Sequence, residues 1–309
     1  MSDHVVSVRF YVLICAILLA LTYLTVTVAF VDLGALNTVA ARWAMQKSRV
    51  DPYVGAMVTV AGAASMVSVI AYLFDRSFIP AADLWAPMLL GLILPGLVQG
   101  IFFKAISDLG ASRTGVIVGT VPIISALLAI AFLDESWTVP LAIGTVLTVF
   151  GGGLIASGER SSDRVRIIGV VFAVLTALGF AARDVMTRAI LTDIEVTPLV
   201  AAAIAQWTGF VVLVIINTVR ARRELADRVR ASLPVMLIPA VIQTAAIAFL
   251  FNAFERGDVT IVGPMNNASQ TIGVVLLGAL VLGRTEATPR VVIAVIAVTT
   301  GAVLVGTAG

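Results

Sequence analysis

Polar side chains gather within residues 263–273, which read GPMNNASQTIG and lie between long apolar stretches. Asn266, Ser269 and Gln270 have the i, i+3, i+4 spacing of one helix face. The neighbouring row holds Asn267 and Thr271. Amides and hydroxyls supply hydrogen-bond donors and acceptors without the cost of burying a charge, so this face suits a wall that contacts a polar solute. The alternative is hydrogen bonding between neighbouring helices within a membrane.

A second chemical signal is the stretch GFAARDVMTRAI, which places charges inside an apolar segment. An ionisable residue inside a membrane span is costly and points to function. Arg183 would bind a solute carboxylate, and Asp184 would take part in proton coupling; alternatively, Asp184 and Arg188 form a structural ion pair at i, i+4. The equivalent place in the first half of the chain is Asn37, with Arg42 near the helix end. That half is therefore neutral where the second is charged, and Asn37 joins the candidates for the solute site.

Weaker candidates for the solute site are single polar or aromatic side chains within apolar segments. They are Tyr23, Asp32, Gln99, Gln206, Trp207 and Gln243. Asp32 is alternatively the end of a helix. An amide beside an indole, as at Gln206 and Trp207, suits a cavity wall, although tryptophan also packs between helices or faces lipid.

Other polar, aromatic and small residues are expected to have structural roles. The tryptophans near expected membrane interfaces are Trp43, Trp85 and Trp137. The expected solvated turn charges are Asp134, Glu135, Arg284 and Glu286. Small residues recur in GGGLIASG at 151–158 and GAVLVG at 301–306, which predicts close helix packing within the bundle or, alternatively, a homodimer face.

The residue inventory excludes several kinds of catalytic site. Cys15 is the single cysteine and His4 the single histidine, so an intrachain disulfide, a thiolate metal site and a Ser-His-Asp triad all lack their parts. The chain has no GxxxxGK[ST] phosphate-binding motif. We therefore expect neither an enzyme nor a bound metal or cofactor.

The composition is that of a polytopic membrane protein. Of the 309 residues, 60% are hydrophobic and 12% charged, and the mean hydropathy is +1.08. Soluble domains carry about 25% charged residues. The small net charge of +2 does not suggest nucleic acid as a partner. The N-terminal run VRFYVLICAILLAL lacks a clear cleavage site, so we expect it to be retained.

Apolar segments of about 20 residues, each long enough for a membrane-spanning helix, recur along the chain. The ten expected spans are 10–45, 52–74, 85–106, 111–133, 138–157, 167–190, 197–219, 234–254, 258–283 and 288–307. The first is overlong and is either one tilted helix or two helices separated near Asp32. The fold class expected is therefore all-α, with ten transmembrane helices.

The two halves of the chain repeat at an offset of about 147 residues. Ten-residue steps run from Arg42 to Pro52 and from Arg188 to Pro198. FFKAISDLGASRTG resembles LFNAFERGDVTIVG, and the spacing from Pro140 to Gly152 recurs from Pro289 to Gly301. Five helices per repeat is an odd number, so the second repeat is inverted in the membrane. We expect the repeats to cover residues 1–158 and 159–309.

These repeats, with their FKAISDLGA and FNAFERGD turns and the short turns FLDESW and VLGRTE, resemble the EamA-type transporters of the drug/metabolite transporter superfamily. The resemblance covers nearly the whole chain, although each motif alone is weak. It implies a central cavity and alternating access, and substrates among amino acids, nucleotide-like metabolites, polyamines or drugs. The long first segment and the amide-rich ninth helix depart from the usual pattern.

Charge and resemblance conflict on orientation. Loops after odd-numbered helices hold fourteen lysines and arginines, whereas the N-terminus and the even loops hold four. The positive-inside rule then places the odd loops in the cytoplasm and both termini outside, whereas the resemblance implies cytoplasmic termini. Five of the arginines lie in RARRELADRVR, which is alternatively an interfacial amphipathic stretch.

The expected function is secondary transport of a small polar metabolite, an amino acid or related zwitterion, with export preferred on resemblance alone. The alternatives are cationic, drug-like or lipid-like substrates, a membrane receptor or scaffold, and a membrane-embedded enzyme. The expected partners are the lipid bilayer, the solute and protons. The expected location is the bacterial inner membrane.

Overall fold

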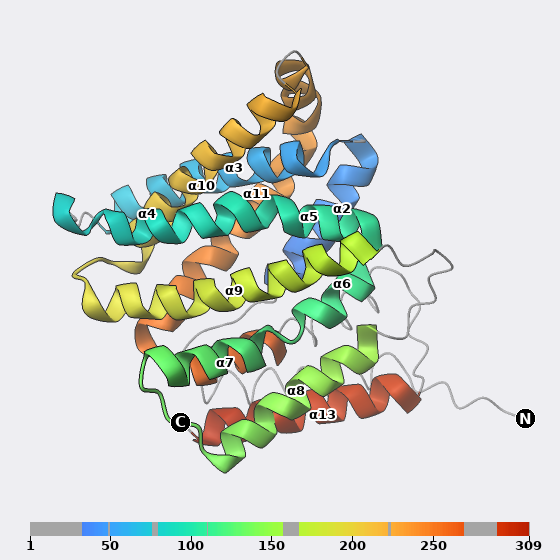
Figure 1. Ribbon diagram of the computed structural model, residues 1–309, viewed down its shortest axis with the longest axis vertical. Helices are drawn as coiled ribbons and strands as arrows, with labels where there is room; N and C mark the ends of the chain where they lie inside the picture. The colour runs from blue at the N-terminus through green and yellow to red at the C-terminus, as the bar shows by residue number, and fades with distance from the viewer. Residues whose placement is uncertain are drawn as a thin grey trace, which may run out of the picture.

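A computed structural model describes residues 33–48, 50–75, 80–109, 111–156, 167–221, 224–268 and 289–308, which are helical apart from short connections (Figure 1). The first half contains α2 (Leu33–Ser48), α3 (Pro52–Phe74), η1 (Ala81–Asp83), α4 (Trp85–Gly91), η2 (Leu92–Leu97), α5 (Val98–Leu109), α6 (Ala111–Val118), α7 (Val121–Phe132) and α8 (Val139–Ala156). The second half contains α9 (Ile167–Asp193), α10 (Pro198–Ala221), α11 (Leu225–Arg256), helical residues 259–268 and α13 (Pro289–Ala308).

Each expected span contains at least one of these helices. Five helical stretches in the described part of the chain are long and apolar enough to cross a membrane: 52–74, 85–109, 167–193, 198–220 and 225–256. The last begins at Leu225 rather than near residue 234. The charged stretch before it forms an exposed helical start, where Arg228 pairs with Glu224 at 2.6 Å.

Helix starts follow from local sequence. The Asp51 carboxylate accepts a hydrogen bond from the Tyr53 amide at 2.9 Å, and Pro52 occupies the first turn of α3, where its missing N–H costs little. The equivalent helix α10 also begins at a proline, Pro198. The repeated Arg-to-Pro step in the sequence therefore ends at the same structural feature in both halves.

The third span is interrupted, which its apolar sequence did not indicate. Leu94 has extended dihedrals (φ −139°, ψ 121°) directly before Pro95, and a short π-type segment joins α4 to α5. Proline removes one helical hydrogen bond and its ring crowds the preceding turn. Gly209 of α10 lies against the Pro95 ring, where a larger residue would collide. The equivalent helix α11 continues through Pro239.

The helix contacts follow an approximate two-fold symmetry. The equivalent helices α8 and α13 pack along each other at one edge of the bundle, as do α3 and α10 at the other (Figure 1). Two further kinds of contact come in related pairs: α5 packs on α9 as α11 packs on α2, and η2 packs on α10 as α11 packs on α3. In these contacts, each half contributes equivalent helices.

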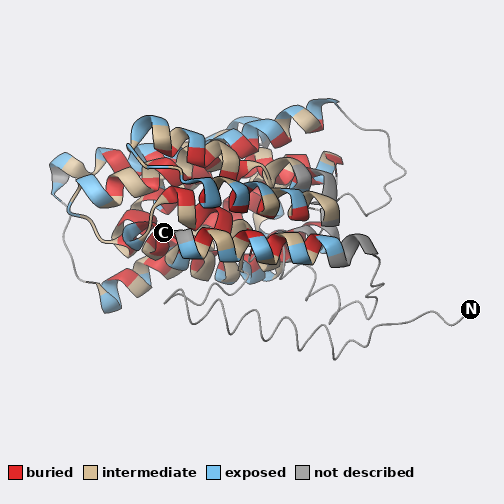
Figure 2. Ribbon diagram, turned by 90° about the horizontal axis from the view of Figure 1, so that it is seen from below, coloured by how far each residue is buried: buried red, intermediate tan, exposed pale blue. Residues whose placement is uncertain are grey.

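The outer faces of the helices carry large apolar side chains, as lipid contact requires. Phe74, Ile167 and Val219 are each at least 80% exposed, whereas small residues such as Ala41, Ala63 and Ala177 are buried between helices. Figure 2 shows buried residues mainly toward the interior of the bundle and exposed residues mainly on its outer faces. Trp43 and Trp85 are also exposed. They remain candidates for interfacial anchors.

Glycines bring α8 and α13 into close contact. A Cβ added at Gly301 would lie 2.6 Å from the Gly144 carbonyl oxygen, and one at Gly144 would lie 2.7 Å from the Gly301 carbonyl oxygen. Gly151 meets the Ala294 carbonyl in the same way. Of the two small-residue stretches, Gly151 and Gly301 are therefore used for packing within the chain.

This contact predicts a difference between two glycines. We expect Gly301→Ala to lower the free energy of unfolding by about 1–3 kcal/mol, because the new methyl group meets backbone that cannot move aside alone. Gly153→Ala is the matched control, since nothing lies within 4 Å of its added Cβ and alanine favours a helix. Thermal unfolding in detergent measures both. Equal midpoints for the two variants would contradict the close contact.

Candidate functional site

Three buried glutamines from α5, α10 and α11 meet inside the bundle. Gln99 of α5 donates from Nε2 to Oε1 of Gln243 in α11 at 3.3 Å, and Gln243 donates from Nε2 to Oε1 of Gln206 in α10 at 3.5 Å. Each residue is at most 5% exposed. From the sequence, these residues are separate candidates for the solute site. The structure brings them together, and we call Gln99, Gln206 and Gln243 the amide cluster.

Gln99 and Gln243 lie in equivalent helices of the two halves. PGLVQ at 95–99 and PAVIQ at 239–243 both place a glutamine four residues after a proline in the third helix of a half. Their offset of 144 residues is four less than the 148 of the repeated stretch that follows in the same helices, so the two glutamines are about one helical turn out of the repeat register.

The buried charge pair is formed by neighbours rather than across a helical turn. Arg183 donates from Nε and Nη2 to Oδ1 of Asp184, at 2.9 and 2.5 Å. Its guanidinium also lies 5.1 Å from the centre of the Phe180 ring. The side chains are 16% and 4% exposed. The alternative of an Asp184–Arg188 pair is therefore wrong, because Arg183 occupies the carboxylate and Arg188 points elsewhere.

The amide cluster and the charge pair lie at similar depth. Gly179 of α9 packs against Val98, which precedes Gln99 in the chain. Arg183 follows Gly179 by about one helical turn, which rises about 5.4 Å. The centre of the bundle therefore combines buried amides with one cation and one anion.

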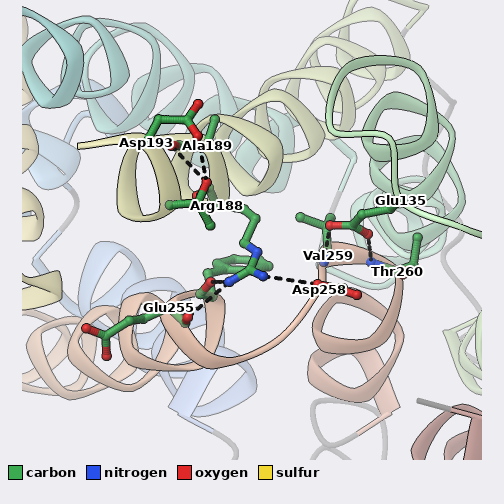
Figure 3. A network of polar contacts seen from close by, with 10 residues as sticks. Glu135, Arg188, Ala189, Asp193, Glu255, Asp258, Val259 and Thr260 are labelled. Atoms are coloured by element: carbon green, nitrogen blue, oxygen red, sulfur yellow. Dashed lines mark hydrogen bonds and ion pairs between the residues drawn. The ribbon is translucent and has the colours of Figure 1, made fainter. Parts of the chain in front are cut away.

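Arg188 binds the end of another helix. It donates to the Phe254 and Glu255 carbonyls at 2.9 and 3.0 Å and to Oδ1 of Asp258 at 3.1 Å (Figure 3). The last carbonyls of a helix lack hydrogen-bond partners within it, and a cation there also interacts favourably with the negative end of the helix dipole. Arg188 thus ties the end of α9 to the end of α11.

Glu135 is not merely a solvated turn charge, as the sequence suggested. Its two carboxylate oxygens accept hydrogen bonds from the Val259 and Thr260 amides, both at 2.9 Å (Figure 3). These amides open helix 259–268 and have no acceptor in that helix. Asp134 beside it does remain exposed. We call Glu135, Arg188 and Asp258, with the backbone groups that they hold, the polar clasp.

The polar clasp borders a hollow of about 380 Å³ at the end of the bundle on the left of Figure 1, where α7 and α9 end and α8 begins. The lining residues are Phe132, Leu133, Asp134, Glu135, Arg188, Thr192, Asp193 and Asp258. This end carries the loops that follow the fourth, sixth and eighth spans, and we call it the even-loop end.

The remaining site candidates are dispersed. Trp207 is 43% exposed and donates from Nε1 to Ser68 Oγ at 2.9 Å, so it faces outward while Gln206 faces inward. The prediction that Gln206 and Trp207 together line one cavity wall is therefore wrong. Asn37, Asn266 and Asn267 are half-buried. Five candidates lie outside the described residues: Tyr23, Asp32, Ser269, Gln270 and Thr271. Within the described residues, no cluster of three or more His, Cys, Asp or Glu side chains could hold a metal ion.

The amide cluster predicts energetic coupling between the two halves. We expect Gln99→Leu and Gln243→Leu each to destabilise the protein, because each leaves a buried amide without its partner, at a cost of about 1–3 kcal/mol. The double variant should cost less than the sum by about 0.6 kcal/mol, typical of hydrogen bonds between membrane helices. Unfolding in detergent supplies the four free energies. Strictly additive costs would contradict the contact.

Comparison with known proteins agrees with this architecture. The model of the EamA-like transporter family matches residues 10–157 and 167–307. A solved structure, described only as "Crystal structure of protein", aligns with a TM-score of 0.65 over 90% of this chain and 98% of its own at 15% identity, which shows a shared fold. No curated protein matches the sequence.

The resemblance drawn from the sequence is thereby confirmed, as is an all-helical membrane protein of about ten helices in two halves. The prediction that the protein is not an enzyme is confirmed by the family as well. The chain belongs to the EamA-like transporter family.

Proposed function

We propose that this transporter exports an amino acid or a related zwitterion across the bacterial inner membrane by alternating access. The repeats proposed at 1–158 and 159–309 would rock against each other around a site at mid-depth. The observation that carries the choice of substrate is the buried Arg183–Asp184 pair, at about the same depth as the buried amides. The direction of transport rests on family resemblance.

The Arg183–Asp184 ion pair has no net charge. It therefore suits a zwitterion, which also carries one positive and one negative charge. Arg183 has five N–H donors and Asp184 has two carboxylate oxygens. Two of those donors, on Nε and Nη2, meet only one of the oxygens, Oδ1. A guanidinium can bind a solute carboxylate through two hydrogen bonds while the aspartate accepts from an ammonium. A singly charged solute would leave one buried charge uncompensated, which is costly.

The amides would complete the site. Gln99, Gln206 and Gln243 add donors and acceptors without charge, and Asn266 and Gln270 remain proposed parts of the wall. One other substrate class keeps specific support: a cationic or drug-like solute would be drawn by the acidic lining of the even-loop hollow. An opening toward the bilayer would be needed to favour a lipid-like solute.

Loss of the Arg183 cation should remove amino-acid transport. We expect Arg183→Gln in proteoliposomes to reduce exchange of labelled zwitterionic amino acids at least 100-fold, because the solute carboxylate loses a charged partner worth several kcal/mol. Arg256→Gln is the matched control, since Arg256 is exposed and its nearest anion lies 3.9 Å away. Wild-type exchange by Arg183→Gln would refute the proposed carboxylate site and leave Arg183 as half of a structural pair.

Asp184 is proposed to couple transport to protons. We expect a pH gradient to drive amino-acid accumulation by the wild type but not by Asp184→Asn, because an amide cannot exchange a proton with the aqueous phases. Exchange of labelled for unlabelled solute without a gradient should persist at a measurable rate in the variant. Gradient-driven accumulation by Asp184→Asn equal to that of the wild type would exclude this role.

A further inference from the structure

We propose that the polar clasp is a gate that closes the even-loop end of the transporter and that the other end has no equivalent of it. This inference rests on the proposed alternating access. It makes the two ends of an otherwise symmetric bundle unequal, and it assigns Glu135, Arg188 and Asp258 to gating rather than to solute binding.

The polar clasp joins parts that must separate if this end is to open. Glu135 belongs to the loop between α7 and α8 of the first half, and the amides it binds belong to the second half. Arg188 joins α9 to the end of α11. Rocking of the two halves apart at this end therefore requires the Glu135 contacts to break. The Arg188 contacts lie within the second half, where they hold α9 to the end of α11 next to the amides that Glu135 binds.

An apolar layer adjoins the clasp and is formed from the same elements. Its buried residues are Ala129, Val185, Leu250, Ala253, Phe254, Val259 and Val262. They come from α7, α9, α11 and helix 259–268. Phe254 and Val259 belong to both the polar clasp and the apolar layer. Their backbone groups are bound by Arg188 and Glu135, and their side chains are buried in the layer. Water and solute are excluded here as long as the clasp holds these four elements together.

Symmetry separates contacts that persist during transport from contacts that alternate. In an inverted-repeat carrier the two halves exchange their arrangements between the states open at either end. A contact between equivalent helices, such as α8 with α13 or α3 with α10, maps onto itself and can persist in both states. The polar clasp is off the axis and maps onto other residues at the opposite end.

The sequence at the mapped positions cannot rebuild the clasp. By the repeat offsets, Arg188 corresponds to Arg42, Asp258 to Gly110 and Glu135 to Arg284. Two cations and a glycine stand where the clasp has one cation and two anions. The state closed at the even-loop end is therefore favoured over the state open there, and solute binding must shift that balance.

The test measures access to the apolar layer with one introduced thiol. The background is Cys15→Ser, which removes the single native cysteine. Ala129→Cys places the reporter in the layer, where alanine is fully buried, and Ala201→Cys places a control in a separate buried cluster that includes other α9 and α11 residues. The rate of reaction with a hydrophilic maleimide is measured on the purified full chain in nanodiscs.

We expect Glu135→Gln and Arg188→Gln each to raise the labelling rate at position 129 at least tenfold, with position 201 unchanged. The matched controls are Asp134→Asn and Arg256→Gln, which make the same charge changes outside the clasp; asparagine also tolerates the positive φ of 53° at position 134. The control variants should label at the wild-type rate.

Two results would overturn the gate. One is an unchanged rate at position 129 in both clasp variants. The other is an equal rise at positions 129 and 201, which would mean that the contacts stabilise the fold as a whole. The labelling assay needs no substrate, so it tests the gate alone. If amino acids are not the substrate, only the transport assays will show it.

Discussion

The hydrocarbon interior of a bilayer offers no hydrogen-bond partner, so every polar group that this chain places there must find one within the protein or face the solute. The buried amide cluster and the Arg183–Asp184 pair meet that requirement at the centre of the bundle. The helices around them present apolar side chains outward. The centre is therefore the place where polar chemistry is concentrated and where a polar solute would be least costly to hold.

The same constraint explains how the two halves are joined. Between lipid-facing helices there is little hydrophobic driving force, so close backbone approach and hydrogen bonds must hold the bundle together. Gly144 and Gly301 supply the first at the α8–α13 contact, and Gln99 with Gln243 supplies the second. Both contacts join equivalent helices of the two halves. Such contacts suit the fixed axis of a carrier, whereas the off-axis polar clasp suits a contact that forms and breaks.

Much of the fold could be predicted from the sequence, because hydrophobic length, charge and proline position act locally. The spans, the repeat and the helix starts at Pro52 and Pro198 follow from such signals. The break at Leu94 could not be foreseen, because the equivalent helix α11 also contains a proline, Pro239, and is continuous through it. The difference lies in packing, since Gly91 and Gly209 allow the broken segment to lie close against α10.

Partners distant in the chain were the hardest part of the site to predict. Polar residues in apolar segments marked Gln99, Gln206 and Gln243, but no local pattern showed that they meet. Spacing alone suggested that Asp184 pairs with Arg188, whereas the pairing of Arg188 depends on the end of α11, 66 residues away. Likewise, Glu135 looked like an ordinary turn charge because the amides that it binds are 124 and 125 residues away.

The central claim is that the buried Arg183–Asp184 pair, which has no net charge, selects a zwitterionic solute. The most direct measurement is competition in proteoliposomes, in which wild-type exchange of a labelled zwitterionic amino-acid mixture is challenged with zwitterionic, cationic and anionic amino acids in turn. The account predicts strong inhibition by zwitterions and weak inhibition by amino acids with a net charge. No exchange of zwitterions, or equal inhibition by cationic amino acids, would contradict it.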